Sequence, residues 1–323
     1  MKKNSKNLWE LIKSTEVDSK NSISEINSFR SIGGFNAKLA SWDPLEKSSR
    51  YYKSLLFSFA SYLDMKIINN SDFKLNSSLP GAGLEFFLSK IDNRDIGQPV
   101  TINYYNNLVD IDYLLSIEEI LFLGETLKSS RKVLEIGPGF GRLSHSLLSI
   151  YPNIQTYYII DLPWMLEISM EFLKKALEED VFNKISFIST DEYNQKEFKA
   201  KFINENNIDL CINIDSFQEM QTEVAFDYLN FIEKVSKNFY SKNAICKYDP
   251  NVVNIILKDK SQYEAALNMG LCKNVIDIYD TNALSEQKDE YLEVFCPSGF
   301  TLKRDEQCFG QFLYYQSALF EKN

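Results

Sequence analysis

Histidine is almost absent from this chain, and cysteine, proline and glycine are sparse. A single histidine, His145, stands among 323 residues, so a metal centre or a mechanism that needs two imidazoles cannot be assembled within one copy of the chain. The five cysteines include no CxxC pair, which excludes a zinc-ribbon pattern and gives no sign of a disulfide framework. We expect them to be buried thiols in a reducing compartment.

Long apolar runs and an excess of basic residues are missing as well. No apolar stretch of the ~18 residues that a membrane-spanning helix needs occurs, and the basic start leads directly into charged residues, unlike a signal peptide. Lys and Arg number 35 against 45 Asp and Glu, a formal net charge of −10, so the overall field repels nucleic acid and anionic lipid. These features predict a cytoplasmic protein with no membrane insertion and no nucleic acid partner.

What is present is an ordinary globular composition, with 44% hydrophobic residues, arranged in two regions. Residues 1–128 show helical spacing, as in Leu8–Ile12 and Tyr52–Leu63, so we expect an N-terminal helical or cap region that ends in one long helix over Ile111–Leu127. In residues 129–323, short β-rich runs alternate with helical segments. This alternation is typical of a parallel sheet with helical crossovers, an α/β fold.

The strands of that sheet are predicted from short apolar runs, each followed by a helix. They are Lys132–Ile136, Gln155–Ile160, Ile185–Ile188, Asp209–Ile214 and Ala244–Lys247. Two later β-rich runs, Tyr291–Phe295 and Phe309–Ser317, have no helical pattern between them. The sheet is therefore expected to end in a C-terminal antiparallel hairpin.

Three of the 12 glycines fall within the loop after the first predicted strand. Gly137, Gly139 and Gly141 would let a ligand approach the backbone closely, because no Cβ stands in the way. A dinucleotide-binding loop needs glycine or alanine where this chain has Arg142. The order here is acid-x-Gly-x-Gly-x-Gly, and the carboxylate of Glu135 would repel a pyrophosphate but suit a cationic ligand.

The second predicted strand leads into an acid, Asp161, roughly 20 residues beyond the last loop glycine. A carboxylate at this place can accept hydrogen bonds from both hydroxyls of a ribose. Asp161 can also cap a helix that begins near Trp164 with Pro163 in its first turn. The two motifs, correctly spaced across β-α-β, together favour a cationic nucleoside cofactor.

These motifs resemble those of the class I S-adenosylmethionine-dependent methyltransferases. Three longer segments, Val133–Leu147, Tyr157–Leu173 and Asp209–Met220, are similar to a narrower group, the sugar O-methyltransferases of bacterial surface-polysaccharide and glycosylation gene clusters; a weaker similarity lies in Gly97–Tyr113. The resemblance implies a Rossmann-like class I methyltransferase sheet. It also implies a cytoplasmic enzyme that moves methyl from S-adenosylmethionine to a hydroxyl of a sugar or sugar nucleotide, with a small-molecule carbohydrate as acceptor.

The same resemblance implies which residues hold the cofactor. Its methionine part would be cradled by Glu135, Gly137, Gly139 and Gly141. The ribose would be bound by Asp161 and Leu162, and the adenine would meet Thr190 and Asp191, just past the third strand.

The catalytic groups are expected outside the carboxyl end of the fourth strand, in the segment Asp215–Met220. Asp215 is the first candidate to remove the acceptor's proton and Glu219 the second. The alternative is helix capping by Asp215 or Ser216, with Gln218 or Glu219 in the first turn. The lone His145 lies in the helix after the glycine loop and is expected to face neighbouring structure.

Acceptor-binding residues are expected in three places. They are the triplet Tyr104, Tyr105 and Asn106, the loop residue Ser216, and Tyr248 after the fifth strand. Aromatic faces suit stacking on a sugar or sheltering a sulfonium cation, with core packing as the alternative. The N-terminal region is expected to supply this lid or pocket wall.

Two other functions stay open on the sequence. One is methyl transfer to a phosphorus-linked oxygen or another small metabolite of envelope decoration, and the other is a catalytically silent S-adenosylmethionine-binding partner protein. No metal-ligand set is predicted, although acidic residues can bind Mg²⁺ without histidine. The sequence indicates no oligomeric state.

Overall fold

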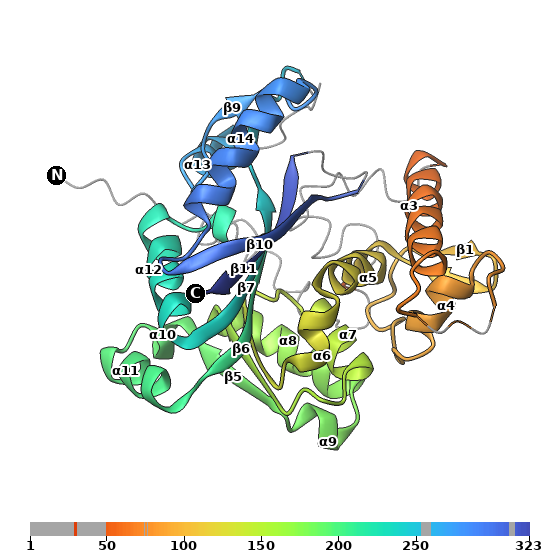
Figure 1. Ribbon diagram of the computed structural model, residues 1–323, viewed down its shortest axis with the longest axis horizontal. Coiled ribbons are helices and arrows are strands. Elements are labelled where there is room, and N and C mark those ends of the chain that lie inside the picture. The colour runs from red at the N-terminus through yellow and green to blue at the C-terminus, as the bar shows by residue number, and fades with distance from the viewer. Residues whose placement is uncertain (1–28, 31–49, 74, 76, 253–259, 310–313) are drawn as a thin grey trace. The chain divides into compact units, whose positions relative to one another are not determined.

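The computed structural model describes residues 29–30, 50–73, 75, 77–252, 260–309 and 314–323 (Figure 1). The helical spacing predicted for Leu8–Ile12 lies outside the described residues.

One sheet of seven strands, in the order β10-β11-β7-β6-β3-β4-β5, carries the fold. Its strands are β3 (Lys132–Ile136), β4 (Thr156–Asp161), β5 (Ile185–Ser189), β6 (Ile208–Ile214), β7 (Ser236–Ala244), β10 (Phe300–Gln307) and β11 (Tyr315–Lys322). β6 runs parallel to β3 and β7, and β4 runs parallel to β5, whereas β11 is antiparallel to both β7 and β10. The predicted Rossmann-like α/β fold, a mostly parallel sheet with a C-terminal antiparallel hairpin, is confirmed.

Helices follow the strands as the alternating pattern predicts. The helices along the sheet region are α7 (Arg142–Ile150), α8 (Pro163–Ala176), α9 (Glu179–Phe182), α10 (Thr190–Tyr193), α11 (Lys196–Glu205), the 3-10 helix η2 (Phe217–Glu219), α12 (Thr222–Val235), α13 (Lys260–Leu267) and α14 (Thr281–Val294). Before the sheet lie α3 (Arg50–Ile68), α4 (Ala82–Leu88), α5 (Ile111–Leu123) and α6 (Glu125–Ser129). Two small sheets pair β1 (Ile102–Tyr104) with β2 (Asn107–Val109) and β8 (Lys247–Tyr248) with β9 (Val275–Ile276).

The chain divides into two compact units, each with its own buried residues. Unit 1 contains Lys132–Gly137 and Glu192–Asn323, and unit 2 contains the described part of Asn21–Arg131 together with Pro138–Asp191. In unit 1, β3, β6, β7, β11 and β10 form a continuous run of paired strands. In unit 2, α3 packs against α4, α5 and β1, and α8 packs against β4 and β5. The predicted division between residues 128 and 129 stays a prediction.

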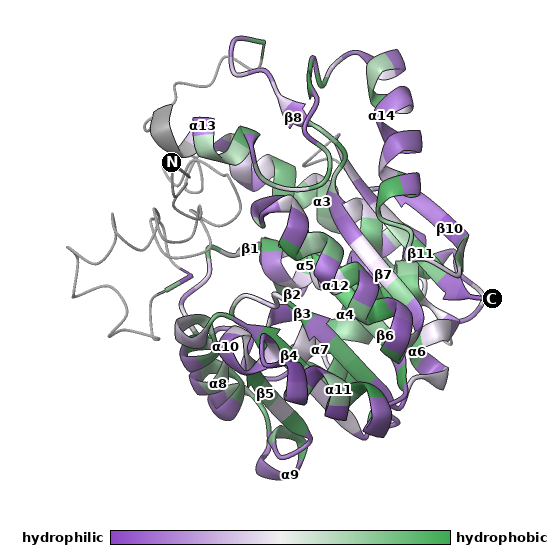
Figure 2. Ribbon diagram, turned by 90° about the vertical axis from the view of Figure 1, so that its left-hand side faces the viewer, coloured by the Kyte–Doolittle hydropathy of each residue, from purple (hydrophilic) through white to green (hydrophobic). Residues whose placement is uncertain are grey.

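Hydropathy follows burial within each unit. Every residue of β3 from Val133 to Ile136 is buried, which fits a strand covered on both faces. By contrast, α11 buries only Phe202, and α14 buries only Leu284 and Tyr291. In Figure 2 the ribbons of α11 and α14 carry purple stretches of hydrophilic residues next to green ones. These two helices therefore cover the core with one narrow stripe each.

The fifth strand was misplaced by the sequence pattern. β7 ends at Ala244, where the predicted strand Ala244–Lys247 begins. Its polar residues Ser241, Lys242 and Asn243 are buried: the side-chain amide of Asn243 donates to Asn213 Oδ1 at 2.9 Å, and Ser241 Oγ accepts from the Tyr291 hydroxyl at 2.8 Å. Because buried polar side chains interrupt its apolar positions, β7 shows no apolar period, and the sequence pattern missed it.

Two further boundaries were wrong. The predicted strand Tyr291–Phe295 is the end of helix α14, where both aromatic rings are buried, and the terminal hairpin is made by β10 and β11. The single helix predicted over Ile111–Leu127 breaks at Gly124, whose φ is 49° and whose N–H bonds to Ile120 O at 2.9 Å. Glycine at this C-cap ends α5 before α6 begins.

None of the described helices combines the length and apolarity needed to cross a membrane. All five cysteines are free thiols; Cys296 is half-buried and the other four are buried.

Candidate functional site

The glycine loop between β3 and α7 has the backbone conformation that its glycines predict. Gly137 has a φ of 72° and lies so close to the side chain of Ser216 that a Cβ would collide with it. Gly139 has a φ of 62°, but a Cβ there would meet nothing within 4 Å. At Gly139 the missing side chain therefore leaves open space beside the backbone, which is the room a closely approaching ligand requires.

Glu135 and the end of β3 belong to unit 1 together with the loop after β6. Glu135 is buried and lies opposite Ile212 in the parallel pair of strands. The Ile136 carbonyl accepts hydrogen bonds from Asn213 Nδ2 at 3.0 Å and from Ser216 Oγ at 3.2 Å. These bonds bring Ser216 next to the start of the glycine loop, so two of the predicted site segments do meet.

Asp215 has a strained backbone, and its side chain is hydrogen-bonded. Its φ of 63° is in the left-handed region, where a non-glycine residue costs about 1–3 kcal/mol. Its Oδ1 accepts a hydrogen bond from the Tyr315 hydroxyl at 2.5 Å and another from the Gln218 side-chain amide. The same amide donates to the Tyr315 hydroxyl at 2.7 Å. Strain of this kind persists only where the surroundings impose it, and it concentrates at functional sites.

The helix-capping alternative for this segment is wrong for the side chains. Ser216 is the N-cap of the short helix η2, Phe217–Glu219, but no side-chain cap hydrogen bond is made there. The oxygens of Asp215 and Ser216 are directed to Tyr315 and to the end of β3 instead. Glu219 is half-buried at the end of η2.

Lys247 is a member of this cluster that the sequence did not single out. Its Nζ donates to the Gln218 carbonyl at 3.2 Å. Burial lowers the pKa of Lys247, while the negative charges of Glu219 and Asp215 act in the opposite direction. Lys247 lies near two buried cysteines and two acids. The sequence did not indicate this position, because the pattern had assigned Lys247 to the end of the fifth strand.

Tyr248 does not follow the fifth strand of the sheet, because it belongs to the separate β8–β9 pair. Its ring packs against those of Tyr263 and Tyr314, with centroids 6.0 and 6.2 Å apart. Its carbonyl accepts a hydrogen bond from the Tyr263 hydroxyl at 3.0 Å. Tyr248 is thus held within a tyrosine cluster, and burial raises its pKa.

The residues predicted for the ribose and adenine lie in unit 2 at one edge of the β4–β5 pair. Asp161 ends β4 and lies opposite Ser189, the last residue of β5; Thr190 and Asp191 follow directly. Asp161 Oδ1 accepts a hydrogen bond from the Leu162 N–H at 2.7 Å. Leu162 is the N-cap residue of α8, whose first residue is Pro163 as predicted, but the helix has no side-chain cap.

Phe140, between the second and third loop glycines, is enclosed by aromatic rings of unit 2. Its ring meets Phe172 edge-on at 4.9 Å and Phe29 at 5.1 Å between centroids. The guanidinium carbon of Arg30 lies 5.4 Å from the Phe140 ring centre. Gly97, whose φ is 86°, makes room for this arrangement, because a Cβ there would run into the Phe29 ring. The glycine loop is therefore held by the segment that contains Phe29 and Arg30.

The guanidinium of Arg30 is buried and forms ion pairs with two carboxylates. Its Nη2 donates to Asp110 Oδ1 at 2.7 Å and its Nε to Asp112 Oδ2 at 2.9 Å. Its Nη1 donates to the backbone carbonyls of Arg94 at 2.6 Å and Ile96 at 3.0 Å. Burial raises the pKa of Asp110, whereas the charge of Arg30 lowers it. Removing this arginine would leave two carboxylates buried without their partner.

Arg142, the residue that excludes a dinucleotide loop, has a structural partner. Its two terminal nitrogens donate to both carboxylate oxygens of buried Glu119, at 2.7 and 2.9 Å. This bidentate pair fastens the start of α7 to α5.

His145 faces neighbouring structure, as expected. It is fully buried, and its Nδ1 is 2.6 Å from the Tyr113 hydroxyl. Burial, together with the positive charges of Arg30 and Arg94, lowers its pKa to about 3. The imidazole is therefore neutral at physiological pH and packs within unit 2.

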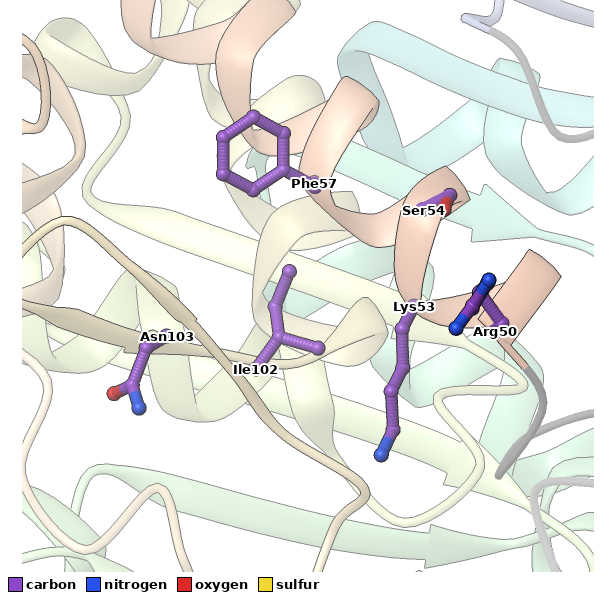
Figure 3. A pocket seen from close by; sticks show the side chains of 6 residues that line it. All are labelled: Arg50, Lys53, Ser54, Phe57, Ile102 and Asn103. Carbon is purple, nitrogen blue, oxygen red and sulfur yellow. The ribbon is translucent and has the colours of Figure 1, made fainter.

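The aromatic triplet before the sheet splits between core and surface. Tyr104 is buried, with its hydroxyl 3.3 Å from Asp64 Oδ2, whereas Tyr105 and Asn106 are exposed. The preceding residues, Ile102 and Asn103, line an open pocket of about 560 Å³. Its other lining residues come from α3: Arg50, Lys53, Ser54 and Phe57 (Figure 3).

In the described parts of the chain, no group of three or more His, Cys, Asp or Glu residues is arranged to hold a metal ion.

No family model matches this chain, and no curated protein matches it. Among solved structures it is similar to the methyltransferase domain of bacterial CtHen1, with 13% identity over 64% of this chain and 97% of that chain and a TM-score of 0.42. It is similar to the mitomycin 7-O-methyltransferase MmcR, with 11% identity, coverage of 94% and 76%, and a TM-score of 0.42. It is also similar to an S-adenosylmethionine-dependent methyltransferase from Clostridium acetobutylicum, with 11% identity, coverage of 64% and 90%, and a TM-score of 0.41.

Proposed function

We propose that the protein is an S-adenosylmethionine-dependent O-methyltransferase. The observation that carries this proposal is the glycine loop after β3, with Gly139 open beside a left-handed backbone and preceded by the buried acid Glu135. An acid at this place disfavours a pyrophosphate and suits a ligand with a positive charge. The carboxylate of Asp161, at the end of β4, supplies the acceptor atoms that a ribose needs.

The residues present fit the cofactor. Its methionine part would lie against the segment Glu135–Gly141, its ribose against Asp161 and Leu162, and its adenine against Thr190 and Asp191. When bound, S-adenosylmethionine supplies an electrophilic methyl group on a sulfonium. The protein then has to align the acceptor oxygen in line with that methyl and remove the acceptor's proton.

Asp215 and Glu219 are the proposed proton acceptors. Asp215 Oδ1 already accepts two hydrogen bonds, so the acceptor's proton would go to Oδ2 of this carboxylate or to Glu219. Tyr315 and Gln218 orient Asp215, and the positive charge of Lys247 supports a negative charge on either acid. Ser216 and Tyr248 would contact the acceptor from the same unit.

The proposed acceptor is a hydroxyl of a sugar or sugar nucleotide, because the segments Tyr157–Leu173 and Asp209–Met220 resemble the sugar O-methyltransferases. Tyr105 and Asn106 have exposed side chains that can reach an acceptor, whereas buried Tyr104 serves to hold its strand. We expect the reaction to take place in the cytoplasm on a small carbohydrate precursor of a surface glycan, without a metal ion.

Calorimetric titration of the full chain tests the cofactor. S-adenosylmethionine and S-adenosylhomocysteine should both bind, and NAD should not. Binding of NAD without binding of either adenosyl compound would refute the proposal. Mass analysis after incubation with S-adenosylmethionine and a panel of sugars, sugar nucleotides and phosphorylated metabolites then tests the acceptor. Cofactor binding without methyl transfer to any of them would favour the silent binding protein.

A further inference from the structure

The pocket in unit 2 is built from one stripe of a helix and one short strand. Arg50, Lys53, Ser54 and Phe57 are spaced three or four residues apart on α3, so their side chains project from the same helix face. Ile102 and Asn103 of β1 form the opposite side, as Figure 3 shows. The volume of about 560 Å³ falls within the usual range of small-molecule sites, about 300–1,000 Å³.

The charged residues that line this pocket are positive, whereas the net charge of the chain is negative. Arg50 and Lys53 stand one turn apart, and like charges at this spacing destabilise a helix. Within the part of the chain that the structure describes, neither cation has a carboxylate partner, and no acid lines the pocket. In a protein with a formal net charge of −10, an anion bound between the two cations would relieve their mutual repulsion.

The remaining lining residues suit an anion that also carries a ring. Ser54 offers a hydroxyl and Asn103 an amide, both of which can donate to a phosphate oxygen. Phe57 is 47% exposed, so part of its ring is open to a ligand. Its ring is held edge-on against buried Tyr104, with centroids 5.1 Å apart, and is therefore a fixed surface for stacking.

We infer that this pocket binds the phosphate-bearing part of a nucleotide-activated substrate, with the two cations on the phosphates and Phe57 against the base or sugar. The inference rests on the proposed function for its biological role, since it narrows the acceptor from a sugar or sugar nucleotide to a nucleoside diphosphate sugar. S-adenosylmethionine carries no phosphate, so the pocket is distinct in its chemistry from the cofactor site.

Titration of the full chain with uridine diphosphate, pyrophosphate and uridine, in the presence of saturating S-adenosylhomocysteine, tests this site. Uridine diphosphate should bind best and lose affinity as salt increases. Arg50→Gln combined with Lys53→Gln should lower the affinity for uridine diphosphate by about 10-fold to 100-fold, the effect of losing charge-assisted hydrogen bonds. Phe57→Ala should lower the affinity for uridine diphosphate and leave the affinity for pyrophosphate unchanged.

The matched control is Lys174→Gln combined with Lys175→Gln, which removes the same charge from exposed positions of α8. This control should keep wild-type affinity for uridine diphosphate. Equal affinity in the Arg50/Lys53 variant and the wild type would overturn the inference, and so would the absence of wild-type binding. Binding of S-adenosylhomocysteine is measured separately, so failure of the pocket and failure of the proposed function give different results.

Discussion

At the scale of single residues, Asp161 offers the cleanest test of the cofactor site. It ends β4, and its substitution removes carboxylate oxygens without removing packed apolar surface. Asp161→Ala should weaken the binding of S-adenosylhomocysteine by about 1.5–3 kcal/mol, the range for hydrogen bonds to a charged group. Calorimetry measures this change. Asp180→Ala, at an exposed acid of α9, is the control and should bind like the wild type; equal affinity in both variants would remove Asp161 from the site.

Asp215 and Glu219 are expected to matter for turnover and not for cofactor affinity. Asp215→Asn and Glu219→Gln keep the size of each side chain and one acceptor oxygen but remove the base. The variant that lacks the true base should lose about 10²–10⁴ in turnover, with unchanged affinity for S-adenosylhomocysteine. Steady-state kinetics with an accepted substrate measure this. Full turnover in both variants would place the base elsewhere, with Lys247 as the next residue to replace.

His145 should make the protein less stable as the pH falls. Its pKa is lowered from 6.5 to about 3, chiefly by burial, so the folded protein binds a proton less readily than the unfolded chain. Above about pH 6.5, protonation of His145 takes nothing from the free energy of unfolding. Below it, this free energy declines by up to about 1.4 kcal/mol per pH unit as the pH falls toward 3.

Urea unfolding of the wild type and of His145→Gln, at pH 7.0 and 5.5, measures this effect. Because the chain has one histidine, no other imidazole contributes. The wild type should lose about 1.3 kcal/mol more than His145→Gln between these pH values. Equal losses would show that His145 does not titrate between the two states as proposed.

At the scale of elements, the glycine loop depends on Phe29, a residue more than 100 positions upstream of it. The Phe29 ring meets both Phe140 of the loop and Phe172 of α8. Phe29→Ala should therefore leave Phe140 loosely packed, destabilise the fold by about 3–5 kcal/mol and weaken S-adenosylhomocysteine. Thermal unfolding and calorimetry measure the two effects. Phe226→Ala, at an exposed ring of α12, is the control. Wild-type cofactor affinity in a folded Phe29→Ala protein would show that the loop holds its shape without this ring.

The sequence predicted best those elements whose ends are marked by glycine or proline. The strand before the glycine loop has the predicted bounds, and α8 begins at Pro163, because three glycines and a proline restrict where the chain can turn. β7 was misplaced because its buried serine, lysine and asparagine side chains hide its period. The sequence predicts a site at Asp215–Met220, which stays a prediction, but it could not indicate the hydrogen bond from Tyr315 to Asp215, since 100 positions separate the two residues.

At the scale of the whole molecule, the first 95 residues are bound to the start of α5 by charge as well as by packing. Deleting residues 1–95 would remove α3, α4 and Arg30, and would leave Asp110 and Asp112 without the guanidinium that they share. An uncompensated buried charge costs about 3–5 kcal/mol, which is a large part of the stability of an ordinary domain. The truncated chain should therefore lose cooperative thermal unfolding, and cofactor binding with it.

A second truncation separates the lost charge pair from the lost packing. Asp110→Asn combined with Asp112→Asn, made in the truncated chain, removes the two unpaired charges while keeping both side-chain shapes. If the charge pair is the main cost, this variant should regain a cooperative melting transition that the simple truncation lacks. In the full chain the same two substitutions should be destabilising, because Arg30 would then be the buried group without a counter-charge. A simple truncation that melts cooperatively and binds S-adenosylhomocysteine would show instead that unit 2 folds without Arg30, and that the N-terminal region serves only the acceptor.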